Sequence, residues 1–559
     1  MGIKNNSRVP APQDSLWKIL WSEQKDLWVV IIYGVFAGIL SLAVPIAVQT
    51  LVNTIGFGSM MQPIVVLTTL VLIILGFAGA LRAMQSFVME IIQQRIFARI
   101  AIDLAYRLPR VRIESFDSNQ SIDLVNRFFD VLVVQKSAAI IILDGIAIIL
   151  QTSLGMILLA FYHPYLLAFD FLLAAGMLFV IFPLGKEAIS TSIDESISKY
   201  QVAAWLQELV RNPLTFRSTG GPEIALKRTD QLTAEYIHHR RDHFQILLRQ
   251  IIGSVLVQVI ASTLLLGLGG WLVIQRQLTL GQLVASELVV TLVVAGFTKF
   301  GKYLETYYDL VAAADKLDHL LNLPLEKQGG ESLPHLSQQT EPASVRMRGV
   351  TFQYQKGVKS LSELNLEIKK GSRVGVLGSN GSGKSTLVSL VYGLREPEIG
   401  TIEIDGVDLR EISLEKMRLH IGFVRGVEIF HGTIFENVSL QRPHVTLQDV
   451  REVLDSLGLL DYVTSLPEGL MTSMVGHPPL SAGQIQRLMI ARAIVGKPRL
   501  LILDESLDSI DAESYPRVLD VLFNPAAPWT LILTTHNEAI SSRCDEVYVL
   551  QGGKMRKLH

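Results

Sequence analysis

Nine residues at 378–386, GSNGSGKST, have the types and spacing of a phosphate-binding loop. They follow the apolar stretch 373–377 and open a segment with a helical pattern. Glycines at three positions let successive backbone N–H groups turn toward one anion, at the positive end of the helix dipole. We expect Lys384 to contact the β- and γ-phosphates and the Ser385 hydroxyl to bind Mg²⁺. The other loop residues expected to contact a nucleotide are Gly378, Ser379, Asn380, Gly381, Ser382, Gly383 and Thr386.

Two later apolar stretches end in residues that suit phosphate chemistry. The first, RLLILDE at 499–505, is expected to form a buried strand, so that Asp504 holds Mg²⁺ through water and Glu505 activates the attacking water. The second, LILTTH, ends in His536, which is expected to reach the γ-phosphate. Tyr354, in TFQYQ, has a ring that can stack on adenine. Taken alone, His536 and Tyr354 are equally compatible with structural roles.

The elements that carry these residues follow a long apolar region. Hydrophobic residues make up 49% of the chain and charged residues 18%, and long uncharged runs fill the first 300 residues. A membrane span needs about 20 apolar residues. The sequence predicts six spans, at 28–52, 62–87, 137–161, 164–184, 246–275 and 279–297.

The distribution of lysine and arginine predicts the orientation of these spans. The links after spans one, three and five are short and nearly uncharged, whereas the other connections are rich in basic residues. By the positive-inside bias, both termini and the C-terminal domain are cytoplasmic, as in an integral protein of a plasma membrane such as the bacterial inner membrane. The second span continues as helix to Pro109, about 70 Å, so that roughly 40 Å would project into the cytoplasm. Residues 186–245 are expected to form a second projection.

Three acidic residues lie inside the predicted spans, namely Asp144, Asp170 and Glu287. Buried acids in a membrane are costly and often functional. They either line a polar translocation path or pair locally near helix ends, and the sequence is compatible with both interpretations.

Composition excludes several classes of function. The net charge of −2 provides no general attraction to nucleic acid, so we expect no nucleic-acid partner. The single cysteine, Cys544, excludes an internal disulfide framework and is expected to be a packing residue. The first apolar run has spanning length and predicts a retained span rather than a cleaved signal peptide, and the segment before it is too short for a peptidase domain.

These patterns predict four parts of the chain. Residues 1–27 form an N-terminal cytoplasmic segment, 28–323 a six-span helical transmembrane domain with long arms, 324–344 a linker and 345–559 a nucleotide-binding domain. In the last part, short β-branched strands alternate with helical segments, which predicts an α/β fold with the phosphate loop at a strand end.

A further motif connects the C-terminal domain with a known family. LSAGQ at 480–484, followed by IQRLMIARAI, resembles the LSGGQ signature of the ATP-binding cassette of ABC transporters. The resemblance implies the cofactors ATP and Mg²⁺ and an α/β P-loop NTPase fold. It also implies that the signature closes over ATP held by the cassette of a second chain, in a homodimer or a heterodimer. The signature residues are Ser481, Ala482, which replaces a glycine, Gly483 and Gln484.

The resemblance covers nearly the whole chain and is that of an exporter half-transporter. Residues 271–285 are similar to the subfamily that exports peptides and proteins, and Ser509, Ile510 and Asp511 match the loop that runs between cassettes. Residues 115–128 and 208–220 would lie near the two coupling helices that dock on cassettes. The exported substrate would be a peptide, protein, lipid or drug-like molecule, and an adaptor protein would be a possible further partner.

The sequence departs from the family at two places. Residues 421–434, IGFVRGVEIFHGTI, lack the usual glutamine that meets Mg²⁺, and Glu428 is the nearest oxygen ligand that could replace it. Before the signature, His477 stands where an acid is common. Because the hydrolytic residues are retained, we predict ATP-driven export. The alternatives are a catalytically weak half of a heterodimer and a membrane-bound, ATP-responsive regulator that transports nothing.

Overall fold

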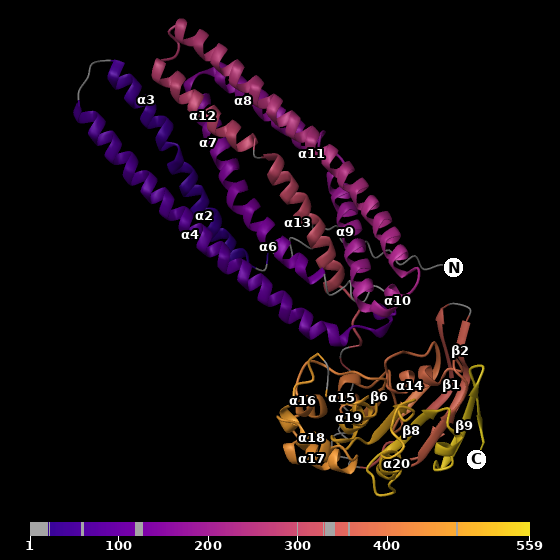
Figure 1. Ribbon diagram of the computed structural model, residues 1–559. Coiled ribbons are helices and arrows are strands. Elements are labelled where there is room, and N and C mark those ends of the chain that lie inside the picture. The colour runs from indigo at the N-terminus through magenta and orange to yellow at the C-terminus, as the bar shows by residue number, and fades with distance from the viewer. Residues whose placement is uncertain are drawn as a thin grey trace. The chain divides into compact units, whose positions relative to one another are not determined.

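The computed structural model describes residues 21, 23–56, 61–117, 127–298, 300–327, 329, 341–355, 358–476 and 479–558 (Figure 1). The chain divides into two compact units. The first comprises Met1–Arg110 and Ser115–Leu323, and the second comprises Val111–Glu114 and Pro324–His559. Each unit has its own hydrophobic core.

The first unit is entirely helical in its described part. Its first predicted span consists of two helices, because Pro45 in the first turn of the second helix lacks the N–H that would continue the hydrogen bonding across Leu42. The α-helices are α2 (Gln24–Ser41), α3 (Ala43–Gly56), α4 (Met61–Arg107), α6 (Asp130–Ile140), α7 (Ile146–Tyr162), α8 (Pro164–Ile181), α9 (Ala188–Arg211), α10 (Pro213–Arg217), α11 (Gly221–Ile274), α12 (Leu280–Thr298) and α13 (Phe300–Leu321).

Two of these helices are much longer than a membrane is thick. Helix α4 has 47 residues and α11 has 54, which correspond to about 70 and 80 Å. The prediction that the second span continues as helix almost to Pro109 is confirmed. The predicted second projection is a pair, because α9 packs along α11 (Figure 1). Arg240 of α11 forms ion pairs with Glu195 of α9 at 3.0 Å and with Glu305 of α13 at 3.6 Å.

Within the described residues, five helices are long and apolar enough to cross a membrane. They are Gln24–Ile55, Met61–Arg110, Arg127–Tyr162, Pro164–Ile181 and Gly221–Ile274, and Leu280–Val293 of α12 is a shorter apolar segment. The predicted sixth span, 279–297, corresponds to α12. Large apolar side chains on these helices are exposed, such as Leu72 at 74% and Phe171 at 70%, as expected of surfaces that face lipid.

The three acidic residues of the predicted spans have different surroundings. Asp144 lies in the π-helical turn Ile141–Gly145 and accepts a hydrogen bond of 3.2 Å from the Tyr303 hydroxyl. Asp170 is 5% exposed, and neither of its carboxylate oxygens has a hydrogen-bond partner among the described residues. The same holds for Glu287 Oε2. Local pairing therefore accounts for Asp144, and a place for Asp170 and Glu287 on a translocation path stays a prediction.

The second unit is built on two sheets. A four-stranded antiparallel sheet has the order β2-β1-β4-β5, and a six-stranded sheet has the order β10-β9-β3-β8-β7-β6. Strands β9, β3, β8, β7 and β6 are parallel, so their carboxyl ends meet at one edge. The strands are β1 (Val345–Gln355), β2 (Val358–Ile368), β3 (Arg373–Leu377), β4 (Ile399–Ile404), β5 (Val407–Asp408), β6 (Ile421–Arg425), β7 (Leu500–Asp504), β8 (Thr530–Thr535), β9 (Glu546–Gln551) and β10 (Lys554–Lys557).

Helices cover the faces of the six-stranded sheet (Figure 1). Strands β7 and β8 are buried along their whole length, which explains their uninterrupted apolar sequences. The helices are α14 (Lys384–Val391), α15 (Leu414–Arg418), α16 (Ile434–Ser439), α17 (Leu447–Ser456), α18 (Leu460–Ser465), α19 (Ala482–Ile494), α20 (Tyr515–Leu522) and α21 (Glu538–Ser541). The α/β fold predicted for this part of the chain is confirmed.

Candidate ATP site

The phosphate loop lies between β3 and α14, at the edge where the parallel strands end. Two of its glycines are required by geometry. A Cβ on Gly378 would lie 2.5 Å from the Leu550 carbonyl oxygen and 2.6 Å from Ser382 Oγ. Gly383 has φ of +107°, and a Cβ there would lie 2.8 Å from the Ser360 carbonyl oxygen. The backbone can therefore make this tight turn only without side chains at these positions.

The lysine of the loop is buried beneath it. Lys384 is 4% exposed, and its ammonium group donates hydrogen bonds to the carbonyl oxygens of Gly378 at 2.7 Å and Ser379 at 3.1 Å. Ser382 Oγ is buried without a hydrogen-bond partner in the described part of the chain. Asn380 and Gly381 are exposed at the tip of the loop. A positive charge and an unused hydroxyl thus lie in a loop at a helix N-terminus, which suits an anionic ligand.

The sheet places the predicted acidic residues at the same edge. Asp504 is the last residue of β7, and Thr534 lies opposite it on β8. The Thr534 hydroxyl donates a 2.6 Å hydrogen bond to Asp504 Oδ1. Glu505, the next residue, has φ of +51°, and its N–H donates to the Thr534 carbonyl oxygen at 3.1 Å. This left-handed backbone turns the Glu505 side chain out of the strand direction, a strain that is frequent at functional sites.

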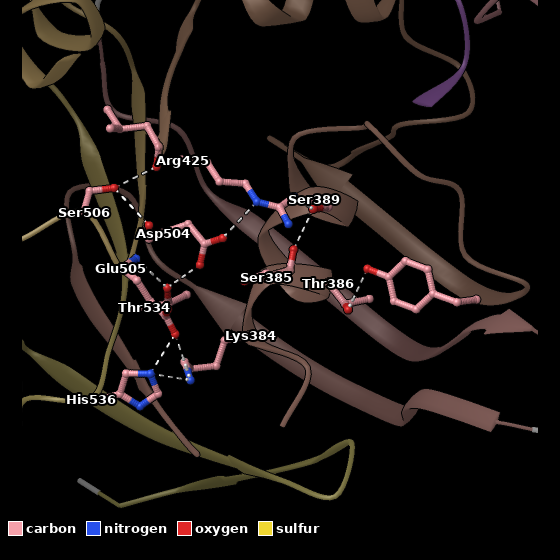
Figure 2. Close-up of polar contacts among 12 residues, drawn as sticks. Lys384, Ser385, Thr386, Ser389, Arg425, Asp504, Glu505, Ser506, Thr534 and His536 are labelled. Atoms are coloured by element: carbon pink, nitrogen blue, oxygen red, sulfur yellow. Dashed lines mark hydrogen bonds and ion pairs between the residues drawn. The ribbon is translucent and has the colours of Figure 1, made fainter. Parts of the chain in front are cut away.

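The three predicted catalytic side chains meet in one cluster (Figure 2). Glu505 Oε1 lies 3.1 Å from Lys384 Nζ and 2.9 Å from His536 Nε2. Lys384 Nζ and His536 Nε2 are 3.4 Å apart. The sequence predicted that these residues lie near one γ-phosphate. In the structure they contact one another, so a nucleotide would have to compete with Glu505 for Lys384.

The residues predicted to hold Mg²⁺ have suitable chemistry. Ser385 lies in the first turn of α14, and the Asp504 carboxylate lies at the same edge of the sheet (Figure 2). Among the described residues, no group of three or more His, Cys, Asp or Glu side chains forms a metal site. Mg²⁺ next to a nucleotide needs no such group, because it binds one or two protein oxygens together with phosphate oxygens and water. A hydroxyl and a single carboxylate therefore fit this ion.

Tyr354 is available to a ligand on only part of its surface. It is 50% exposed, and its hydroxyl lies 3.1 Å from Thr386 Oγ1. The Arg395 guanidinium lies 4.6 Å from the centre of its ring, in a cation–π contact. Stacking of adenine on that ring face would require Arg395 to move.

The signature motif caps a different helix. Ser481 is the N-cap of α19, and its hydroxyl accepts a hydrogen bond from the Gln484 N–H while the Gln484 side chain accepts one from the Ser481 N–H. This reciprocal capping box stabilises the helix start. Ser481 and Ala482 are exposed, and Gly483 packs closely under the loop that contains Ser509. The exposed helix start is thus free to meet another surface.

The loop predicted to run between cassettes is attached to α19. Arg487 of α19 forms a 3.3 Å ion pair with Asp511. Hydrogen bonds from Ser514, together with the nearby Arg487 guanidinium, hold the pKa of Asp511 below its ordinary value.

Sequence reasoning missed Arg425, which lies beside the residue predicted to hold Mg²⁺. Arg425 is the last residue of β6 and lies opposite Asp504 in the parallel register. Its Nε is 3.5 Å from Asp504 Oδ2. Arg425, rather than Glu428, is therefore the residue of the altered loop that the structure places beside Asp504, whereas the Glu428 carbonyl oxygen accepts a hydrogen bond from Arg492. A charged residue at the end of an apolar strand was the signal that could have identified it. His477 lies outside the described residues.

Comparisons with known protein families agree with this architecture. The family model for the ABC transporter transmembrane region matches residues 27–296, and the model for the ABC transporter domain matches residues 361–508. The chain is an ABC exporter half-transporter. The transmembrane and ATP-binding domains are fused in one polypeptide, which is an ATPase-coupled transporter, and its family forms dimers of two such chains.

Related proteins align over almost the whole half-transporter. The leukotoxin translocation ATP-binding protein LktB of Mannheimia glucosida is 26% identical over 536 residues, which are 94% of this chain and 74% of the relative. The alpha-hemolysin translocation ATP-binding protein HlyB of Escherichia coli O157:H7 is 25% identical over 535 residues, with the same two coverages. A solved bacterial Atm1-family ABC exporter with ATP bound has a TM-score of 0.84 at 20% identity, covering 95% of this chain and 94% of that one. This last similarity concerns the fold.

Proposed function

We propose that this half-transporter, as a dimer, exports a polypeptide across the membrane and that hydrolysis of Mg²⁺-ATP drives the export. The observation that carries the proposal is the cluster of Lys384, Glu505 and His536 at the end of the sheet, in a chain similar over its length to proteins named for toxin translocation. In this proposal the chain crosses the plasma membrane six times, with α12 as the sixth span. Both termini and the cassette lie in the cytoplasm. An adaptor protein is compatible with this role.

Each residue of the site would have a distinct role in ATP hydrolysis. Lys384 and the N–H groups of the loop bind the β- and γ-phosphates, and the exposed start of α19 in the partner chain closes over them. Mg²⁺, held by Ser385 and Asp504, would supply positive charge to the phosphate oxygens. Glu505 accepts a proton from the attacking water as a general base, and His536, which contacts the same carboxylate oxygen as Lys384, orients the γ-phosphate.

The long helices would transmit the closing motion of the cassettes to the membrane spans. The short helix α10 joins α9 to α11 within the predicted coupling segment 208–220. Leu214 of α10 and Val210 near the end of α9 are 81% and 80% exposed. Apolar side chains at the tip of an arm favour docking on another surface. The first predicted coupling segment, 115–128, lies mostly outside the described residues. ATP can drive the cycle only through its higher affinity for the closed state.

One observation favours a second candidate function. Arg425 lies beside Asp504, at the start of the loop that lacks the family's usual glutamine, and this favours a catalytically weak half of a heterodimer. A regulator that transports nothing would have no need of Glu505.

The test is the ATPase activity of purified protein in lipid bilayers, compared with Glu505→Gln. We expect the parent to be at least about a hundredfold more active, because general-base catalysis contributes at least that factor. Equal rates would refute a working hydrolytic site in the homodimer. Recovery of activity only after addition of a second half-transporter chain would support the heterodimer.

A further inference from the structure

Arg425 contacts both elements that carry the predicted Mg²⁺ ligands. Its Nε lies 3.5 Å from Asp504 Oδ2, and its Nη1 donates a 3.2 Å hydrogen bond to Ser389 Oγ (Figure 2). Ser389 in turn donates to the Ser385 carbonyl oxygen at 2.6 Å. Residues four apart lie on the same face of a helix. The guanidinium therefore lies against the face of α14 that carries Ser385, with the metal-binding carboxylate on its other side.

The position of this arginine follows from the sheet register. In a parallel pair, residues in register direct their side chains to the same face. Arg425 and Asp504 are such a pair, and both are the last residues of their strands. The Asp504 side chain is 3% exposed and that of Arg425 is 50% exposed. The guanidinium thus approaches a buried carboxylate from the solvent side, which is the side from which a nucleotide and its metal would arrive.

The surroundings disfavour moving Arg425 away from Asp504. The cleft on its other side is lined by three further arginines and two glutamates, namely Arg418, Arg442, Arg492, Glu415 and Glu428. One glutamate carbonyl oxygen and the Asn437 carbonyl oxygen already accept hydrogen bonds from Arg492. The cleft has more arginines than glutamates, so a guanidinium turned into it would meet a net positive charge, whereas at Asp504 it has an opposite charge. Position 425 therefore keeps a permanent positive charge in the phosphate site.

We propose that Arg425 is a built-in cation that lowers the affinity of the site for Mg²⁺ and sustains ATP binding without the metal. The inference rests on the proposed binding of Mg²⁺ by Ser385 and Asp504. Arginine cannot lose its charge at physiological pH, so it repels a divalent ion at Asp504 and attracts the γ-phosphate. A glutamine at the same position would offer the metal an oxygen and no opposing charge.

The size of the effect follows from charge separation. A guanidinium about 6 Å from a divalent ion, with water-like screening, changes metal affinity roughly tenfold. We expect Arg425→Gln to bind Mn²⁺, a paramagnetic probe for Mg²⁺, about tenfold more tightly in the presence of a non-hydrolysable ATP analogue. The same variant should bind the analogue several-fold more weakly in EDTA.

The experiment uses the full-length protein in nanodiscs. Affinity for the analogue is measured by displacement of a fluorescent nucleotide, once in excess Mg²⁺ and once in EDTA, and Mn²⁺ binding is measured by electron paramagnetic resonance. Arg425→Lys keeps the charge and should behave like the parent. Arg451→Gln, at an exposed position of α17, removes the same charge elsewhere and should also leave both affinities unchanged. Arg425→Ala provides a second neutral variant, and thermal unfolding compares the folding of all proteins.

Two failures are distinguishable. If Mg²⁺ strengthens analogue binding equally in the parent and in Arg425→Gln, the inference is wrong and the proposed metal site stands. If Mg²⁺ has no effect on any variant and Asp504→Asn changes nothing, the proposed metal site itself is wrong, and the inference falls with it.

Discussion

The contact between Glu505 and Lys384 predicts that the proposed catalytic carboxylate opposes nucleotide binding. Oε1 and Nζ are 3.1 Å apart, and the Lys384 side chain is 3% exposed. A bound γ-phosphate would need the same ammonium group and would lie near the negative charge of Glu505. The variant Glu505→Gln removes that charge while preserving the size and shape of the side chain. We therefore expect it to bind ATP more tightly although it hydrolyses ATP far more slowly.

The magnitude follows from the distance and from solvent exposure. Two opposite unit charges 3.1 Å apart attract each other by about 1.3 kcal/mol in a water-like dielectric. The Glu505 side chain is 38% exposed, and ion pairs that solvent reaches contribute about 1 kcal/mol or less. If Glu505→Gln removes about 1 kcal/mol of attraction that competes with ATP for Lys384, the Kd for ATP should fall roughly fivefold.

The assay must separate binding from turnover and from the metal. Binding of a non-hydrolysable ATP analogue is measured in EDTA by displacement of a fluorescent nucleotide, with the full-length protein in nanodiscs. Glu513→Gln is the matched control, because Glu513 is an exposed acid of the same cassette, and its loss changes the net charge equally. An affinity of Glu505→Gln no higher than that of the parent and of this control would refute the reasoning.

Further predictions concern the loop, the signature helix and the cassette core. Gly383→Ala should weaken ATP binding more than tenfold and lower the melting temperature. Residue 383 has φ of +107°, and a Cβ there would lie 2.8 Å from a backbone oxygen, which together cost about 3 kcal/mol of stability. Gly381→Ala, at a position with open space around it, should cost about 1 kcal/mol of stability. Ser481→Ala removes the N-cap of α19 and should lower the stability of the cassette by about 1 kcal/mol in chemical denaturation. Burial, with a smaller contribution from a neighbouring carboxylate, raises the pKa of Cys544 to about 12, so maleimide should label it slowly in the native protein and rapidly after unfolding. Burial and nearby positive charge lower the pKa of His420. The unfolded state therefore binds its proton first as the pH falls below about 6.5, and thermal stability measured against pH should decline less steeply in His420→Gln.

Much of the site is encoded in short segments of the chain. The phosphate loop, the strand that ends in Asp504 and the strand that ends before His536 are each local patterns, and their order along the sequence indicated the family. The stretch without a helix-breaking residue up to Pro109 likewise predicted the long helix α4. Such features depend on neighbours within a few residues, so they are visible without a fold.

The contacts between these segments could not be predicted in the same way. Glu505 and Lys384 are separated by more than a hundred residues, and their contact depends on strand order and on the left-handed backbone at Glu505. The helix break near Pro45 was likewise missed, because apolar composition alone does not distinguish one span from two successive helices.

The sequence by itself determined that this protein has apolar helices for a membrane and a cassette for ATP. It also indicated that the loop at 421–434 departs from the family. Only the tertiary structure decided what that departure means, because the register between β6 and β7 places Arg425 opposite Asp504. Register is set by the packing of whole strands in the sheet, and a shift of one residue would direct this arginine to the other face. The positive charge beside Asp504 is therefore a property of the fold.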